Sequence, residues 1–370
     1  MKTAQELFTE RLNRIKTVVA LEKPDRVPVV PLATSFCANH LGVKISAIAD
    51  NPKLLNETII KSFTQLGEFD ALQQATFSVH LLSAAWLAKV KIPGRDLPET
   101  VSWQVAENEL MTVKDYDTII SKGYNAFFGE FQANRLDNLL VKLQPFADYL
   151  PEAINRIQEI GVVPLSPGAQ AIIPYEAFCG GRTMPKFMHD LFKMPDKVQA
   201  AMDASMPDII QNLRAVYHGA GFVGAWVGGW RSASEFLAPK AWQRFVWPYM
   251  KQLAEVLLAE AVIPIFHLDS NWERDLDFFR QLPKGKCIIS PDSSTNIFKI
   301  KEVLGDHMAI MGDVPAALFA LGTPEDVYNY STKLIREIGP RGFILSSGCD
   351  IPFNAKPENV AAMLAAATGE

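Results

Sequence analysis

Short apolar runs recur along the chain, and each is followed by a longer stretch in which apolar residues repeat at helical spacing. This alternation is typical of strand–helix units that build a parallel sheet. The runs are nearly continuous, as expected of strands that are covered on both faces. We predict strands at residues 27–33, 70–77, 161–168, 221–229, 262–269, 286–292, 308–314 and 342–349.

Eight strand–helix units predict an α/β fold, a (β/α)8 TIM barrel formed by residues 1–370 as a single domain. Hydrophobic residues make up 48% of the 370 positions, which is enough to bury a large core. The stretch from about residue 82 to 158 breaks the rhythm, because it is rich in charged and turn-forming residues. We expect this N-terminal insertion to cover the barrel mouth.

The charge distribution excludes several classes of function. A formal net charge of −5, with both signs scattered along the chain, leaves no basic stripe for nucleic acid. No stretch approaches the ~20 apolar residues that cross a membrane. The N-terminus predicts a capped helix, with Thr3 and Glu6 as its capping box, and not a signal peptide. We therefore expect a cytoplasmic protein.

Function in a (β/α)8 barrel resides on the loops that leave the carboxyl ends of the strands. Nearly every chemically capable residue of the chain lies at such a strand end, which favours an enzyme. Asp292 and Asp313 are candidates for proton transfer. Candidates for binding a flat, apolar substrate are Phe77, His80, Trp226, Trp230 and Trp272, although aromatic residues at these positions also serve as core.

His267 and Asp269 are separated by one residue at the end of a predicted strand. Residues two apart on a strand point to the same face, with Cα atoms ~6.5 Å apart, so both can reach one ion or one substrate atom. A structural hydrogen bond between them is the alternative. Cys349 lies just past the last apolar run and adds a sulfur donor. Nitrogen, oxygen and sulfur donors together predict a catalytic zinc site whose ligands meet across the mouth.

Several segments, in order along nearly the whole chain, resemble the uroporphyrinogen decarboxylase superfamily. They include "ALEKPDRVPVVP", "GGRTMPKFMHDLFKMPDKV", "FHLDSN", "GDVPAALFALGTPEDV" and "GFILSSGCDIPFNAKPENVAAM". The resemblance implies a (β/α)8 barrel. The true decarboxylases grip porphyrinogen carboxylates with arginines after the first strand, whereas residues 31–43 here contain no arginine. Porphyrinogen decarboxylation is therefore disfavoured.

The chain is also similar to the cobalamin-dependent methyltransferases of this superfamily, among them the O-demethylase components. By that resemblance, His267 and Cys349 match zinc ligands, and Asp269 stands where the family has a cysteine. A carboxylate makes zinc a harder Lewis acid, better suited to polarising an oxygen than to carrying a thiolate. Glu176 or Glu235 could supply a fourth ligand that substrate displaces.

The resemblance implies a zinc-dependent enzyme that moves a methyl group from a methoxylated aromatic, such as a methoxybenzoate, to the Co(I) corrinoid of a partner protein. The corrinoid is expected on that partner, because the chain carries no D-x-H-x-x-G cobalamin signature. One alternative is methyl transfer from a methyl-corrinoid protein to a thiol or a folate. Another is a metal-free decarboxylase-like lyase, in which Asp269, Asp292 or Asp313 handles protons.

Overall fold

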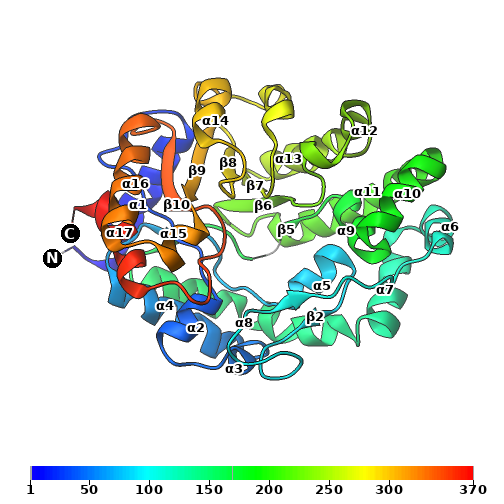
Figure 1. The fold of residues 1–370 in the computed structure, drawn as a ribbon, viewed down its shortest axis with the longest axis horizontal. Coiled ribbons are helices and arrows are strands. Elements are labelled where there is room, and N and C mark those ends of the chain that lie inside the picture. The colour runs from blue at the N-terminus through cyan, green and yellow to red at the C-terminus, as the bar shows by residue number, and fades with distance from the viewer. Residues whose placement is uncertain (1, 169, 370) are drawn as a thin grey trace.

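The sheet of the barrel is largely parallel and follows the order of the chain. The computed structural model describes residues 2–168 and 170–369. Within them, neighbouring strands pair in the order β10 (Phe343–Ser347), β9 (Ala309–Val314), β8 (Ile288–Pro291), β7 (Ile263–Leu268), β6 (Gly224–Gly229) and β5 (Gln170–Ala171) (Figure 1). All of these pairs are parallel.

Short strands and single backbone hydrogen bonds close the sheet into a barrel. Strand β1 (Ala71–Leu72) pairs in parallel with β4 (Val163–Pro164). Three bonds join this pair to the longer strands and complete the ring: Gly224 N to Leu165 O (2.7 Å), Asp70 N to Val29 O (2.9 Å) and Leu345 N to Pro28 O (2.9 Å). The predicted (β/α)8 barrel is thus confirmed.

The predicted strand at residues 27–33 is the exception, because it forms only an isolated bridge between Val29 and Leu345. Pro28 and Pro31 lie in this run. Proline has no N–H to donate to a ladder, so the segment stays extended in the barrel wall without a continuous set of bonds. The other seven predicted runs each contain a strand, usually shorter than predicted.

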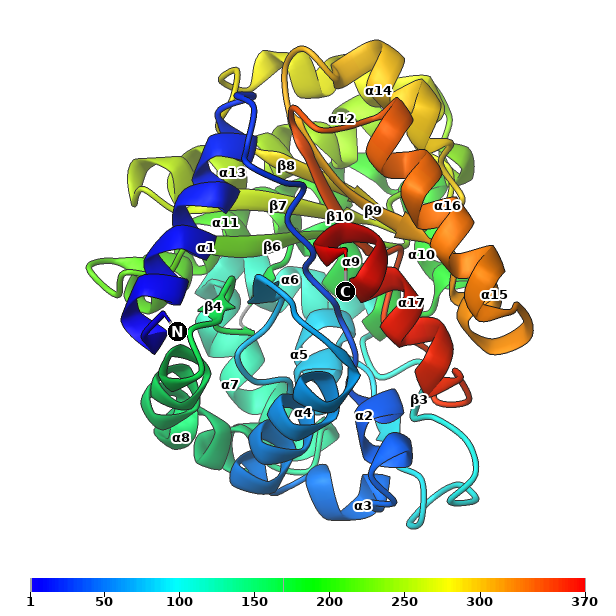
Figure 2. The same cartoon turned by 90° about the vertical axis from the view of Figure 1, so that its left-hand side faces the viewer.

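Helices surround the barrel on its outer side, as Figure 2 shows in a view turned by 90°. Before β6 these are α1 (Ala4–Val19), α2 (Ser35–His40), α3 (Ile45–Ile48), α4 (Pro52–Leu66), α9 (Pro174–Arg182), α10 (Met184–Lys193) and α11 (Pro195–Tyr217). After β6 they are α12 (Pro239–Phe245), α13 (Trp247–Ala259), α14 (Ile297–Leu304), α15 (Ala316–Leu321), α16 (Pro324–Glu337) and α17 (Pro357–Thr368). The capping box of Thr3 and Glu6 at the start of α1 is present as predicted.

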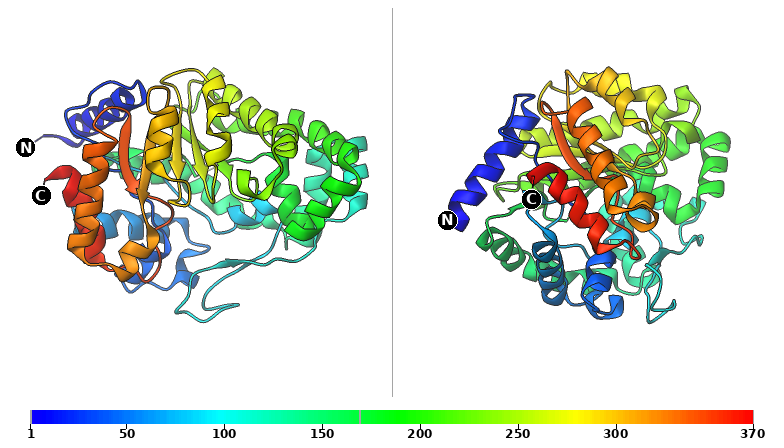
Figure 3. Two further views of the ribbon diagram at one scale, coloured as in Figure 1. Left: turned by 45° about the horizontal axis from the view of Figure 1, so that its top comes forward. Right: turned by 60° about the vertical axis from the view of Figure 1, so that its left-hand side comes forward.

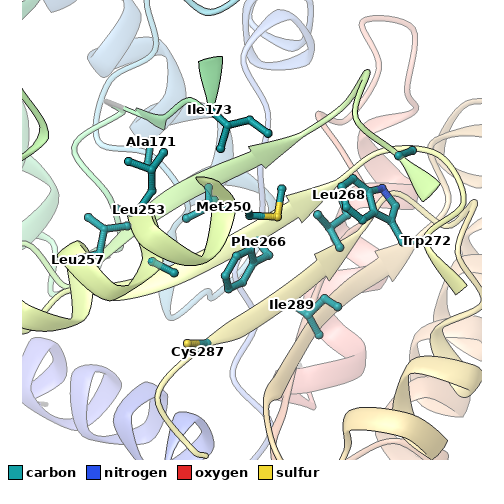
Figure 4. Close-up of a cluster of buried hydrophobic side chains, with 14 of the residues drawn as sticks. Ala171, Ile173, Met250, Leu253, Leu257, Phe266, Leu268, Trp272, Cys287 and Ile289 are labelled. Carbon is teal, nitrogen blue, oxygen red and sulfur yellow. The ribbon is translucent and has the colours of Figure 1, made fainter. Parts of the chain in front are cut away.

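Two apolar layers lie on the two faces of the barrel wall. The inner layer includes Val30, Ile265 and Ile344, and Ile15 and Val18 of α1 join it, so α1 plugs one end of the barrel. The outer layer fills the space between strands and helices. In Figure 4, Phe266 and Leu268 lie in this layer with side chains of α13 that include Met250, Leu253 and Leu257.

The segment 82–158 contains most of helix α5 (Leu81–Trp86), a small antiparallel hairpin and three further helices. The hairpin consists of β2 (Val90–Lys91) and β3 (Gln104–Val105), and the loop around it projects from the body of the molecule (Figure 3, cyan). The helices are α6 (Val113–Lys122), α7 (Tyr124–Arg135) and α8 (Leu139–Glu159). Helix α8 packs against α4 and α1. The single-domain division, with this segment as a cover, stays a prediction.

Candidate metal centre

The alternation of β7 places His267 at the barrel mouth. Phe266 and Leu268 face the outer helices, so Ile265 and His267 face the barrel interior. Ile265 packs in the inner apolar layer, and His267 is one step of the pleat further toward the carboxyl end of the strand. Its side chain is 2% exposed. The ring is therefore held at the floor of the mouth.

An indole ring fixes the orientation of this histidine. Trp226 of β6 also points inward, and its ring stacks on that of His267 with centroids 4.2 Å apart and planes 24° apart. Such contact favours one ring plane by packing alone. Only one ring edge of His267 is engaged: Nε2 lies 3.4 Å from Asp269 Oδ1, whereas Nδ1 is buried with no hydrogen-bond partner among the described residues.

Asp269 begins the loop after β7, and both its backbone N–H and its carbonyl make hydrogen bonds. Its N–H donates to Gly229 O at 2.8 Å, and its carbonyl accepts from Trp272 Nε1 at 2.7 Å. The side chain is 35% exposed, so it stands between the buried histidine and the open pocket. Trp272 itself is fully buried among aromatic residues. We predicted that Trp272 binds substrate, but its observed contact is with the backbone of this loop.

Cys349 reaches the same point from the other side of the mouth. It follows Gly348, whose N–H donates to Val314 O at 3.0 Å. A Cβ at Gly348 would lie 2.9 Å from the backbone of Asp292, so only glycine allows this close approach. The two strands that carry His267 and Cys349 are not neighbours, yet one donor atom from each of His267, Asp269 and Cys349 lies within 4.8 Å of the others.

The electrostatics of this cluster favour a positive charge. Burial by itself lowers the pKa of His267, but hydrogen bonding and attraction from Asp269 and Cys349 outweigh burial and raise that pKa to about 10. A carboxylate and a sulfur thus surround a buried position where a cation is stabilised. A bound metal ion supplies the same charge, with the imidazole neutral.

The donor set fits zinc. Zinc takes nitrogen, oxygen and sulfur ligands in tetrahedral geometry, and two ligands with bonds of ~2.0–2.1 Å then lie ~3.4 Å apart. The separation between His267 Nε2 and Asp269 Oδ1 is 3.4 Å. Asp269 Oδ1 is buried, and within the described part of the chain it has no partner other than this ring nitrogen. A buried carboxylate oxygen without a donor is expected where a ligand completes the site.

A pocket of about 270 Å³ opens above the three donors. Its walls are aromatic: Phe77, Trp86, Trp103, Trp226 and Trp230 line it. The aromatic rings also contact one another, with centroids 5.0 Å apart for Trp86 and Trp230 and 5.7 Å apart for Phe77 and Trp103. Three of the predicted substrate-binding residues, Phe77, Trp226 and Trp230, thus surround the predicted metal ligands.

Glycine at position 228 allows one of these rings to fold back over its own strand. A Cβ at Gly228 would lie 2.2 Å from the Trp230 ring. The next turn is secured by Glu176, which is fully buried and accepts the N–H groups of Trp230 (2.8 Å), Arg231 (3.0 Å) and Ser232 (3.0 Å). Burial raises the pKa of Glu176, although these bonds oppose the shift. Both oxygens are occupied, and Glu176 is not in the cluster with His267.

Two further acids that we predicted in the site link neighbouring loops. Glu235 accepts the Asn271 N–H at 2.9 Å, and so joins the loop after β6 to the loop after β7. Asp292 accepts the N–H groups of Ser270 (3.0 Å) and Ser294 (2.7 Å), and so joins the loops after β7 and β8. Neither Glu235 nor Asp292 is in the described cluster of metal-binding donors. Both hold the loop that carries Asp269.

Asp313 and His80 lie outside the described lining of the aromatic pocket. Asp313 is buried and accepts a hydrogen bond from Tyr330 at 2.9 Å. Burial raises the pKa of Asp313 to about 7. His80 is bonded to Asp50 through Nε2 at 2.6 Å and faces a separate groove with Asp50 and Arg95. The structure therefore does not bring these two predicted residues to the metal cluster.

Several pocket residues were missed by the sequence reasoning. Trp86 ends helix α5 (Leu81–Trp86), and Trp103 precedes β3, so neither follows a predicted strand. Gln74 also lines the pocket. A possible signal was the position of both tryptophans in the segment expected to cover the mouth. Periodicity alone does not distinguish such residues from core.

Fold and site together define a (β/α)8-barrel protein with a candidate metal centre at the carboxyl ends of its strands. The chain belongs to the uroporphyrinogen decarboxylase family, whose model, described as Uroporphyrinogen decarboxylase (URO-D), matches residues 10–369. A solved methyltransferase from Methanosarcina mazei has a similar fold, with a TM-score of 0.72 over 99% of this chain and 98% of that chain, at 17% identity. The comparison with curated proteins finds no match. Within the described residues, no helix is long and apolar enough to cross a membrane.

Proposed function

We propose that this protein is a zinc-dependent methyltransferase, which transfers a methyl group from a small methoxylated aromatic compound to the reduced corrinoid of a partner protein. The observation that carries the proposal is the meeting of His267, Asp269 and Cys349 beneath an aromatic pocket. Membership of the uroporphyrinogen decarboxylase family and a fold similar to that of a methyltransferase are consistent with it.

The three donors would hold the zinc ion, and the aromatic rings would hold the substrate. Trp226 stacks on His267 and also lines the pocket, so one ring orients a ligand of the metal and contacts the substrate. A flat arene between indole rings gains both apolar burial and ring stacking. Zinc, when bound, supplies a Lewis acid that stabilises negative charge on the ether oxygen.

The chemistry needs such stabilisation at one atom. In methyl transfer, the methyl–oxygen bond breaks and both of its electrons remain on the oxygen. The methyl carbon takes up the electron pair of Co(I) from the partner's corrinoid, which becomes methyl-Co(III). The arene leaves as a phenolate and is protonated from water. Asp269 lines the pocket and is 35% exposed, so the corrinoid would approach the methyl group from this side.

The proposal is tested by incubating the zinc-loaded protein with cob(I)alamin and a panel of methoxyarenes, methylamines and methanol. We expect methylcobalamin and a phenol to form in equal amounts from a methoxyarene. Formation of methylcobalamin only from the amines or from methanol would contradict the assignment of the donor. Transfer only from methylcobalamin to a thiol or a folate would reverse the direction that we propose.

A further inference from the structure

Trp86 lines the aromatic pocket but does not belong to a strand of the barrel, so its ring needs support from elsewhere. We propose that Arg231 is a positioning residue of this pocket, whose guanidinium holds the Trp86 indole in place as a wall for the substrate ring. The inference deepens the proposed function and rests on it for the nature of the substrate. Arg231 itself is not among the described residues that line the pocket.

The backbone of Trp86 is held firmly, whereas the helix does not hold its ring. Helix α5 ends at this residue, and the next one, Leu87, is fully buried in a left-handed conformation with φ 45°. Gly180 of α9 packs directly on the helix end, because a Cβ there would lie 2.0 Å from the Trp86 carbonyl oxygen. The indole Nε1 makes a long hydrogen bond of 3.4 Å to Glu176 Oε2. The ring orientation therefore depends on the groups that pack against the indole.

Two successive residues of the loop after β6 contact this indole. The Trp230 ring meets it at a centroid distance of 5.0 Å, with an angle of 69° between the planes. Arg231 places its guanidinium over the Trp86 ring, 5.7 Å from the centroid. An edge-to-face ring pair and a cation over an indole face are both attractive, because the ring is negative on its faces and positive at its edge.

The guanidinium is held in turn by a carboxylate of segment 82–158. Glu107 accepts hydrogen bonds from Arg231 Nη1 at 3.1 Å and from Nη2 at 2.8 Å. The same carboxylate accepts the Met184 N–H of α10 at 2.9 Å, so its own position is fixed as well. The Arg231 N–H donates to Glu176 at 3.0 Å, and the Arg231 side chain is only 19% exposed. A bidentate pair fixes the plane of the guanidinium, which a lysine ammonium cannot reproduce.

A wall that is held in place favours binding, because ordering a mobile side chain lowers affinity. An indole that is free to turn loses rotamer freedom when a substrate ring packs against it, and that loss weakens binding. Trp86 is half-buried, so without its partners the ring would have room to turn toward solvent. Arg231 restricts the indole before the substrate arrives. We therefore expect Arg231 to affect substrate affinity and not the chemical step at the metal.

Arg231→Met tests the inference, because methionine keeps an unbranched apolar side chain but has no charge and no N–H donors. Binding of 2-methoxyphenol and of methoxybenzene to the zinc-loaded full chain is titrated by tryptophan fluorescence. KM and kcat are measured from methylcobalamin formation. We expect Kd and KM to rise about tenfold, with kcat within about twofold of the wild type. Arg231→Lys keeps the cation without the bidentate pair and should raise Kd about threefold.

Arg244→Met is the matched control. Arg244 also stands over an aromatic ring, 4.9 Å from the centroid of Phe245, and it also pairs with a carboxylate, that of Asp196. It belongs to α12 and is not among the described residues that line the pocket. This variant should keep the wild-type values of Kd, KM and kcat.

A double-mutant cycle distinguishes an effect through Trp86 from a general effect on the fold. In a Trp86→Leu background, Arg231→Met should no longer raise Kd, because the ring that Arg231 positions is absent. A further rise of about tenfold in that background would show that Arg231 acts through another group, and would overturn the inference.

The outcomes separate this inference from the proposed function. Binding of the probes that weakens as expected in Arg231→Met, without methyl transfer to cob(I)alamin, would support the inference and overturn the function. Methyl transfer by the wild type, with the same Kd in the wild type and Arg231→Met, would support the function and overturn the inference. Failure of both probes to bind the wild type would overturn the inference as well.

Discussion

Asp70 and Asp269 are carboxylates at opposite ends of the barrel, and their surroundings differ in one decisive respect. Asp70 is fully buried and accepts bonds from Arg14, from Arg26 at 2.7 and 3.0 Å, and from Val29 N at 2.8 Å. Asp269 Oδ1 is buried, and apart from His267 Nε2 at 3.4 Å it faces no hydrogen-bond donor among the described residues.

This difference distinguishes buried polar groups that stabilise the fold from those that bind a ligand. At Asp70, the chain supplies both the negative charge and its partners, and the cluster ties α1 to the barrel wall. At Asp269, the chain places an acid, an imidazole and a thiol around one buried position, where either a proton on His267 or a bound metal ion supplies the positive charge. A polar cluster that is satisfied by the protein stabilises the fold, whereas one that is not indicates a ligand.

The largest expected effect is the loss of activity on removing the central ligand. His267→Ala should lower the rate of methyl transfer about 10⁴-fold, equivalent to ~5.5 kcal/mol, because the leaving oxygen loses the Lewis acid. The rate is measured as methylcobalamin formation from a methoxyarene. His218→Ala, at a histidine that is 81% exposed, is the matched control and should keep the full rate. Equal rates of methyl transfer in the two variants would contradict a role of His267 in the site.

A substitution at Asp70, at the opposite end of the barrel, should lower the free energy of unfolding and should not affect methyl transfer directly. Asp70→Asn leaves Arg14 buried without its fully buried partner, and breaking such a pair costs about 3–5 kcal/mol. Asp269→Asn should cost clearly less than Asp70→Asn, because Asp269 is 35% exposed and its partner His267, unlike an arginine, becomes neutral by losing a proton. Urea denaturation of the metal-free proteins measures both values. Similar losses of unfolding free energy in the two variants would contradict the proposed difference between the two carboxylates.

Glu176 lies at the functional end of the barrel, but both of its oxygens accept hydrogen bonds from the protein. It therefore tests whether location alone, or the lack of protein donors, marks a carboxylate that binds a ligand. Glu176→Gln replaces one acceptor oxygen by an amide nitrogen that repels the N–H groups of Trp230, Arg231 and Ser232. We expect a loss of about 1–3 kcal/mol in the free energy of unfolding. The zinc content should stay at the wild-type level. Loss of zinc in this variant would instead support our prediction from the sequence that Glu176 is a ligand.

Substitution of Asp313 should have the smallest effect, a change in unfolding free energy that depends on pH. Its folded pKa of about 7 exceeds the usual value of 3.8, so the folded chain binds a proton that the unfolded chain has released. Stability from this group is full below about pH 4 and is lost as the pH rises to about 7. Asp313→Asn should therefore match the wild type near pH 4.5 and exceed its unfolding free energy by about 1–2 kcal/mol at pH 8. A constant difference across this range would contradict the assignment.

The sequence predicted the barrel well because its strands are apolar on both faces. Prediction failed for pairing at residues 27–33, where prolines remove ladder donors. Among site residues, His267 and Asp269 could be found from their spacing on one strand. Cys349 required the resemblance and the barrel geometry together.

The remaining site residues depend on tertiary contacts that no local pattern reports. Glu176 and Asp292 lie next to the mouth, but backbone N–H groups use their oxygens. Trp86 and Trp103 enter the pocket from a segment outside the strand–helix rhythm. Contacts between loops that are distant in sequence determine which acid has its oxygens hydrogen-bonded and which aromatic ring points into the pocket.

The metal content of the purified protein tests the central claim most directly. We predict about one equivalent of zinc in the wild type and less than about a tenth in Cys349→Ala, with unchanged circular dichroism. Cys287→Ala, at a buried core cysteine, is the matched control and should retain its zinc. Less than about a tenth of an equivalent in the wild type, or equal zinc in the wild type and Cys349→Ala, would contradict a metal centre built from His267, Asp269 and Cys349.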